Sequence, residues 1–291
     1  MKILLAVDSS AESDLAIDVV AARPWPQSTA VEVLSVVEPL YASEEPNLIQ
    51  TLKQRAEDAV QAAAQQLRRS GIEPATRVLC GNAKGAIVEY ARQSGTDLIV
   101  VGSHTVTTVR QFLRGSVARA VVRFAPCSVE VDRGNAGPGA MKILLATDGS
   151  QYSEAAARSI AERPWPAGTE VRIISVADHD LRLSGIANRR HFDAQAMKKL
   201  EKVAIQRAQE AVTSAEKIII EGRLALSGTI AVTAAAPKER ILKEADDFGA
   251  NLIVLGSHGH GELTRLVLGS VSEAVATLAP CSVEVIRRSR T

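Results

Sequence analysis

Glycines and hydroxyls in the segment that begins at Gly256 have the types and spacing of a loop that wraps a phosphate group. The segment reads GSHGHGELTRLVLGSV, which contains Gly256, Gly259 and Gly269, and Ser270 directly follows Gly269. We expect Gly256 and Gly259 to turn the backbone with positive φ and to bring bare N–H groups close to an anion. Gly269 and Ser270 would open a helix, whose free amides and dipole favour negative charge. The segment therefore predicts a polyphosphate site.

A second polar break, Asp148-Gly149-Ser150, follows another apolar run. In open parallel sheets, ligands bind beyond the carboxyl ends of the strands, where the winding changes direction. We therefore expect this turn and the glycine loop to face the same ligand. Ser272 either adds a hydroxyl donor there or caps the helix that follows Gly269.

The elements that must position these loops occur twice along the chain. MKILLAVDSS at residue 1 returns as MKILLATDGS at residue 141, RPWP returns at Arg163 after Arg23, and APCSVEV returns at Ala279 after Ala125. The offset between the copies rises from 140 to 154, so copy two carries a net insertion of 14 residues. We expect one domain over 1–133, a Gly- and Pro-rich linker over 134–140, and a second domain over 141–288.

Within each copy, apolar runs and amphipathic stretches alternate, and apolar residues (46%) are mainly aliphatic because aromatics make up only 3%. This alternation is typical of right-handed βαβ units on a parallel sheet, which indicates the α/β class with five strands per copy. In copy one, strands are expected near 3–7, 31–36, 76–79, 98–101 and 129–131, and helices near 10–22, 48–69, 84–93 and 116–124.

The pattern G-x2-G-x9-G-[S/T] after a buried strand, together with the Asp-Gly-Ser turn, resembles the universal stress protein family over both copies. The resemblance implies two tandem Rossmann-like domains of the adenine nucleotide alpha hydrolase-like type. Each would hold a five-stranded parallel sheet in the order 3-2-1-4-5, flanked by helices, with ATP or ADP between the first and fourth strands. It implies Asp148 at the adenine, Val176 at the base pocket, Leu255 and Gly256 beside the ribose, and Gly259, Gly269, Ser270 and Val271 at the phosphates.

Copy one departs from this pattern. Thr105 stands where copy two has Gly259, and Ser9 stands where it has Gly149. A β-branched residue would pay about 1–3 kcal/mol to hold a positive φ, so we expect copy one not to bind ATP in the same way. The degenerate equivalents of the site are Asp8, Val36, Gly102, Gly115 and Ser116. Four arginines in this region either face solvent and the other copy or bind an anion differently: Arg110, Arg114, Arg119 and Arg123.

Composition excludes several classes of partner. A net charge of +1 with 23% charged residues creates no field that would draw the chain to nucleic acid or an anionic membrane. The chain has no apolar run of about 18 residues, so no membrane-spanning helix is expected. Cys80, Cys127 and Cys281 form neither a metal-binding pattern nor an even set for disulfides. These features predict a cytoplasmic protein.

No arrangement of catalytic residues stands out. His104 and His258 lack a carboxylate at a spacing that would orient them, and His258, His260 and Glu262 do not fix a metal geometry. Magnesium would arrive only with the nucleotide. We therefore expect a nucleotide-binding regulatory or stress-response module that is not an enzyme. Two alternatives remain, a slow ATPase in which Glu262 or Glu273 orients water, and a ligand-free protein-interaction scaffold.

The last expected strand of each copy, 128–131 and 282–285, would leave an unpaired sheet edge. We expect the two strands to meet edge to edge, so that one chain imitates a homodimer of single copies. A homodimer of the whole chain is left open.

Overall fold

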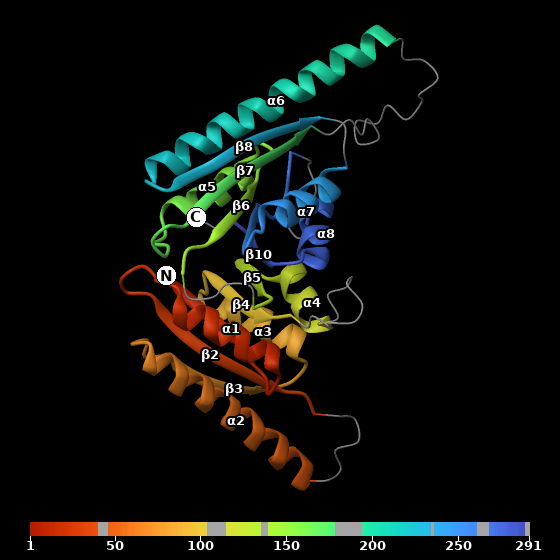
Figure 1. Ribbon diagram of the computed structural model, residues 1–291. Helices are drawn as coiled ribbons and strands as arrows, with labels where there is room; N and C mark the ends of the chain where they lie inside the picture. Colours follow the sequence, from red (N-terminus) through yellow and green to blue (C-terminus); the bar gives the residue numbers. More distant parts are fainter. Residues whose placement is uncertain are drawn as a thin grey trace.

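The computed structural model describes residues 1–39, 46–103, 115–134, 139–177, 194–233, 236–260 and 268–288. These residues form the α/β fold that the sequence predicts (Figure 1). The strands of copy one are β1 Lys2–Ala6, β2 Ala30–Val37, β3 Ala75–Cys80, β4 Leu98–Gly102 and β5 Ser128–Asp132. Those of copy two are β6 Lys142–Ala146, β7 Glu170–Ala177, β8 Ala225–Thr233, β9 Leu252–Gly256 and β10 Ser282–Ile286.

All the described strands belong to one ten-stranded sheet with the order β3-β2-β1-β4-β5-β10-β9-β6-β7-β8. Each copy therefore runs third, second, first, fourth, fifth, and its own strands pair in parallel. Between the copies β5 and β10 pair antiparallel, with Val131 opposite Val283 and Val129 opposite Val285. The pairing leaves neither strand as a free edge, and it joins the two sheets into one.

Helices cover both faces of this sheet. They are α1 Ala11–Ala22, α2 Pro46–Arg69, α3 Ala83–Ser94 and α4 Ser116–Phe124 in copy one, and α5 Gln151–Ala161, α6 Ala194–Glu221, α7 Pro237–Phe248 and α8 Ser270–Leu278 in copy two. The long helices α2 and α6 lie at opposite ends of the molecule, whereas α4 and α8 lie near its centre beside β5 and β10 (Figure 1). The helices that follow the two glycine loops are thus the ones nearest the junction.

Burial on both faces explains the continuous apolar runs of the strands. In β1, Ile3 and Leu5 pack in a cluster with residues of α1 and α2, whereas Leu4 points to the opposite face. Leu144 of β6 points to that same face, where one apolar cluster runs through both copies beneath α3, α4, α7 and α8. Alternation along each strand therefore gives every copy its own core on one face and a shared core on the other.

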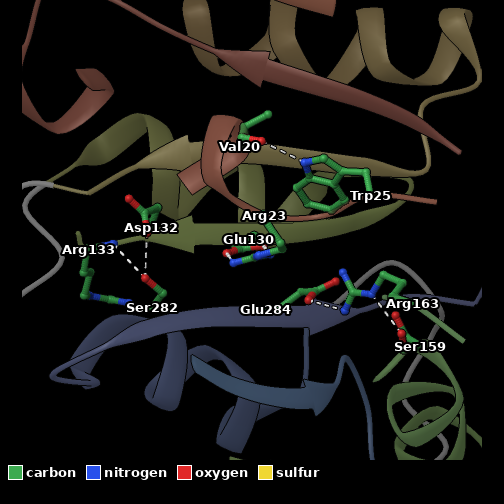
Figure 2. Close-up of polar contacts among 10 residues, drawn as sticks. All are labelled: Val20, Arg23, Trp25, Glu130, Asp132, Arg133, Ser159, Arg163, Ser282 and Glu284. Carbon is green, nitrogen blue, oxygen red and sulfur yellow. Dashed lines mark hydrogen bonds and ion pairs between the residues drawn. The ribbon is translucent and has the colours of Figure 1, made fainter. Parts of the chain in front are cut away.

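Buried ion pairs from the repeated RPWP and SVEV segments lie at the junction (Figure 2). Arg23 binds Glu130 of β5 with two contacts of 2.7 Å, and Arg163 binds Glu284 of β10 at 2.7 Å. The guanidinium of Arg163 lies over the Trp165 ring, 4.9 Å from its centroid. The repeated segments therefore serve the contact between the copies.

Candidate functional site

The Asp148 turn lies at the carboxyl end of β6 and opens α5. Ser150 N donates to Asp148 Oδ1 at 3.0 Å, and the Ser150 hydroxyl caps α5 by accepting from Ser153 N at 3.3 Å. Gly149 has φ +78°, and a Cβ there would also lie 3.2 Å from the Cβ of Ala211 on α6. This turn needs glycine for two reasons, the left-handed backbone and the close approach of the long helix.

Two contacts join this turn to the loop that follows β9. His260 Nε2 lies 2.8 Å from the carbonyl oxygen of Asp148, and the Ser150 hydroxyl donates to the carbonyl oxygen of His258 at 3.4 Å. The structure therefore brings together the two polar loops that the sequence analysis expects to share a ligand. The contact of His260 was not foreseen, since nothing in its spacing marks it.

The expected positive φ at Gly256 and Gly259 is wrong. Of the glycines in this site only Gly149 is left-handed. Close approach is the reason for the others: a Cβ at Gly256 would lie 2.7 Å from the carbonyl carbon of Tyr152, and one at Gly259 would lie 2.6 Å from Asp148 Oδ2. Gly259 thus lets the loop pass directly beside the Asp148 carboxylate.

The start of α8 carries backbone donors beside the loop that follows β9. Gly269 is the N-cap residue with φ −63°, and no side chain of the described residues caps the helix. Gly269 N donates to the carbonyl oxygen of Ser257 at 2.9 Å, which holds the helix start against the loop. Ser270 is exposed beside it and Val271 is half-buried. Uncapped amides at the positive end of a helix dipole can bind an anion.

Ser272 has a different role from either one that the sequence left open. Its hydroxyl is buried and donates to the carbonyl oxygen of Gly256 at 2.7 Å. This bond ties the first turn of α8 to the end of β9, so it sets the distance between the helix start and the strand.

The remaining predicted residues lie around the same end of the sheet. Leu255 is buried in the shared apolar cluster, and half-buried Val176 packs against that cluster. Val176 lies two residues beyond Ile174, which pairs with Ala146 at the end of β6. Leu255 and Val176 therefore belong to the apolar layer at the end of the sheet where the polar loops begin.

His258 packs as a structural residue. Its side chain is buried, its Nδ1 lies 3.0 Å from the Ser257 hydroxyl, and its ring lies against Tyr152 with 5.0 Å between centroids. His258 thus packs on its two neighbours. His104 and Glu262 lie outside the described residues.

The framework of copy one is similar, but its Asp8 turn is closed differently. Asp8 Oδ1 accepts from Ser10 N at 3.0 Å and from the Ser13 hydroxyl at 2.8 Å, and it also accepts from the Ser10 hydroxyl. Ser9 does not have the positive φ of Gly149. Three donors therefore hold the Asp8 carboxylate against the start of α1, whereas Ser150 N is the donor described for Asp148 Oδ1.

Other positions of copy one match their counterparts. A Cβ at Gly102 would collide with the carbonyl oxygen of Glu12, as one at Gly256 would with α5. Gly115 begins α4 without a side-chain cap from the described residues, Ser116 is exposed and Val36 is half-buried. Thr105, Arg110 and Arg114 lie outside the described residues.

Arg123 faces the other copy, as one of the two expected arrangements required. Its NH1 lies 3.9 Å from Glu273 Oε1, and its guanidinium lies over the Phe124 ring. Glu273 on α8 is thereby directed toward copy one. Arg119 is exposed. Glu273 itself lies in the first turn of α8.

Burial governs the ionisable groups at the junction. Burial, and then the nearby Glu130, raise the pKa of Asp132 to about 6, while Cys127 and Cys281 have thiol pKa values raised by burial to about 12.

The described residues contain neither a cluster of potential metal ligands nor a membrane span. Within the described part of the chain no three His, Cys, Asp or Glu side chains are grouped to hold a metal ion. No helix in that part is long and apolar enough to cross a membrane.

Both copies are similar to known proteins of one family. Residues 1–133 and 140–287 each match the model of the Universal stress protein family. The chain is 25% identical over 298 residues to a universal stress protein of Mycolicibacterium smegmatis, covering 98% of this chain and 96% of the relative.

A solved structure shows the same fold. A universal stress protein from Archaeoglobus fulgidus matches with a TM-score of 0.69 and 20% identity over 99% of this chain and 98% of that one. A family member from Arabidopsis thaliana, whose structure has AMP bound, is 20% identical over 45% of this chain and 90% of that one, with a TM-score of 0.35.

Proposed function

The chain belongs to the universal stress protein family, and from this premise we propose that copy two binds one adenine nucleotide, ATP or ADP. The observation that carries the proposal is the meeting of three groups at one end of the sheet. The Asp148 carboxylate lies beside Gly259, and the start of α8, which no side chain of the described residues caps, follows the same loop. A carboxylate that accepts from an exocyclic amine and a helix end that donates to phosphate together match the two ends of such a ligand.

The proposed roles of the residues follow from these positions. Asp148 accepts from the adenine and Val176 offers its backbone to the base. Leu255 and Gly256 flank the ribose. The backbone groups of Gly259, Gly269 and Val271 and the exposed Ser270 hold the phosphates, with or without Mg²⁺ brought by the nucleotide.

We propose a regulatory or stress-response module rather than an enzyme. Glu273, one of the two carboxylates considered for orienting water, lies 3.9 Å from Arg123 of copy one. Residues 1–133 and 141–288 would act as two domains joined by 134–140, with the β5–β10 contact in place of a homodimer interface. Free cysteines at Cys80, Cys127 and Cys281 support action in the cytoplasm, a reducing compartment.

Calorimetric titration of the ligand-free protein with ATP and with ADP tests the proposal. One site per chain is expected, and Gly259→Thr should lose most of the affinity, since its Cβ would displace the Asp148 carboxylate. Thr105→Gly in copy one is the control and should restore little binding there, because the Asp8 turn is also different. Absence of binding, two equivalent sites, or full binding by Gly259→Thr would overturn the proposal. Steady phosphate release that Asp148→Ala abolishes in a folded protein would establish an ATPase instead.

A further inference from the structure

Arg133, the residue that follows β5, reaches from copy one into copy two (Figure 2). Its backbone N donates to the Ser282 hydroxyl at 3.0 Å. Its guanidinium donates to two carbonyl oxygens of copy two, Cys281 at 2.9 Å and Ala276 at 2.5 Å. Ala276 lies in the last turn of α8, so Arg133 binds the C-terminal end of the helix that follows the glycine loop.

Arg287 makes the corresponding contacts in the opposite direction. Its backbone N donates to the Ser128 hydroxyl at 3.2 Å, and its NH2 donates to the carbonyl oxygens of Val122 and Arg123 at 2.9 Å each. Val122 and Arg123 lie in the last turn of α4. Each copy therefore supplies an arginine that donates to carbonyl oxygens at the C-terminal end of a helix in the other copy, Arg133 at α8 and Arg287 at α4.

The physical role of these arginines follows from the helix ends. The last carbonyl groups of a helix lack partners within the helix and carry the negative end of its dipole, so a cation there is favourable. Arg133 is 6% exposed, and burial lowers its pKa to about 10, which leaves it charged at neutral pH. The carbonyl groups at the helix end supply acceptors for the buried guanidinium, and the guanidinium supplies donors for those carbonyl groups.

Because α8 is short, a contact at its last turn also affects the position of its first turn. It has nine residues, which corresponds to about 13 Å at 1.5 Å per residue. The bond between the Ser272 hydroxyl and the carbonyl oxygen of Gly256 holds its first turn, and Arg133 holds its last. Without the Arg133 guanidinium, the last turn of α8 loses this hydrogen bond and keeps its apolar packing through Val275 and Ala276, so its position is less tightly fixed.

We propose that Arg133, although it belongs to copy one, is a positioning residue for the nucleotide site of copy two, and that this contact couples that site to the junction between the copies. The inference rests on the proposed nucleotide binding. It adds that copy two depends on its neighbour for full affinity, and that a bound nucleotide in turn strengthens the contact between α8 and Arg133.

The pseudo-symmetry of the chain provides a matched control. Arg287→Gln removes contacts of the same kind as Arg133→Gln, but it frees α4 instead of α8. Helix α4 also carries Ala118 at the position of Ser272, so it lacks the hydroxyl that ties α8 to its strand. The two variants should lose similar amounts of global stability while differing at the copy-two site.

Calorimetric titration with ATP and ADP, chemical denaturation and amide exchange of the whole chain test the inference. Arg133→Gln should weaken copy-two binding roughly tenfold, equal to about 1.4 kcal/mol, whereas Arg287→Gln should stay within about twofold of the wild type. Arg133→Lys, which keeps the charge without the fork, should fall between them and also serves if the glutamine variant does not fold. Equal affinities in the two glutamine variants, or a larger loss in Arg287→Gln, would overturn it.

Amide exchange separates failure of this inference from failure of the proposed function. In ligand-free protein, the first turn of α8 should exchange faster in Arg133→Gln than in Arg287→Gln. If the wild type binds neither nucleotide, the proposed function fails, yet this difference would still establish that Arg133 positions the helix. If the wild type binds and exchange at α8 is the same in both variants, the positioning role fails alone.

Discussion

Glu130 and Glu284 lie directly opposite each other in the antiparallel pair of β5 and β10, and both are buried. Like charges in such a pair are destabilising unless they are neutralised. Arg23 and Arg163 each bind the glutamate of their own copy at 2.7 Å. The junction between the copies therefore contains two buried ion pairs, in which each arginine neutralises one glutamate. Variants that remove one of these charges test how much the pairs contribute to stability.

Removal of one member of these pairs should be costly. Arg23→Ala leaves Glu130 buried without its bidentate partner, and we expect a loss of about 3–5 kcal/mol in the free energy of unfolding, measured with urea. Arg158→Ala, which removes an exposed pair with Glu154, is the control and should cost less than about 1 kcal/mol. Similar losses of unfolding free energy in the two variants would mean that the buried pair stabilises the protein no more than an exposed pair does.

Asp132 should make stability depend on pH. Its pKa is raised to about 6, so the folded state binds the proton more tightly than the unfolded state does. Stability from this group is therefore full in acid and is lost as the pH rises through about 6, by at most about 3 kcal/mol. Asp132→Asn stays neutral, so its unfolding free energy relative to wild type should increase from about pH 4 to about pH 7.

Urea unfolding of both proteins at the two pH values measures this difference. The value at the lower pH is the internal control, because it contains the effect of the altered hydrogen bonds to the Ser282 hydroxyl and Gly134 N. A difference that does not change with pH would show that Asp132 ionises normally.

His260 should contribute to nucleotide binding by joining the two loops. His260→Val introduces the residue that copy one has at Val106 and removes the bond to the Asp148 carbonyl oxygen. Loss of one such bond is worth about 1 kcal/mol, so we expect roughly a fivefold weaker affinity for ATP by calorimetry. His260→Gln keeps a donor and should retain more of the affinity. Equal losses in both variants would assign the effect to the ring instead of the bond.

The sequence alone determined the α/β class, the two copies, the element order and the two loops at the end of the sheet. These features are encoded locally, because apolar periodicity and turn residues act within a few positions of one another. The expected helix at 116–124 and the expected loop after β9 needed no distant contact to be recognised. The duplication strengthened the prediction, since each motif could be compared with its counterpart.

The tertiary structure decided which contacts the conspicuous residues make. Gly259 was expected to need a positive φ, yet its reason is the carboxylate of Asp148, which lies far away in the sequence. Arg23 and Arg133 likewise stand out only when their partners Glu130 and Ala276 are in place. Such contacts depend on the register of β5 against β10 and on the packing of short helices, and no local pattern along the chain specifies either.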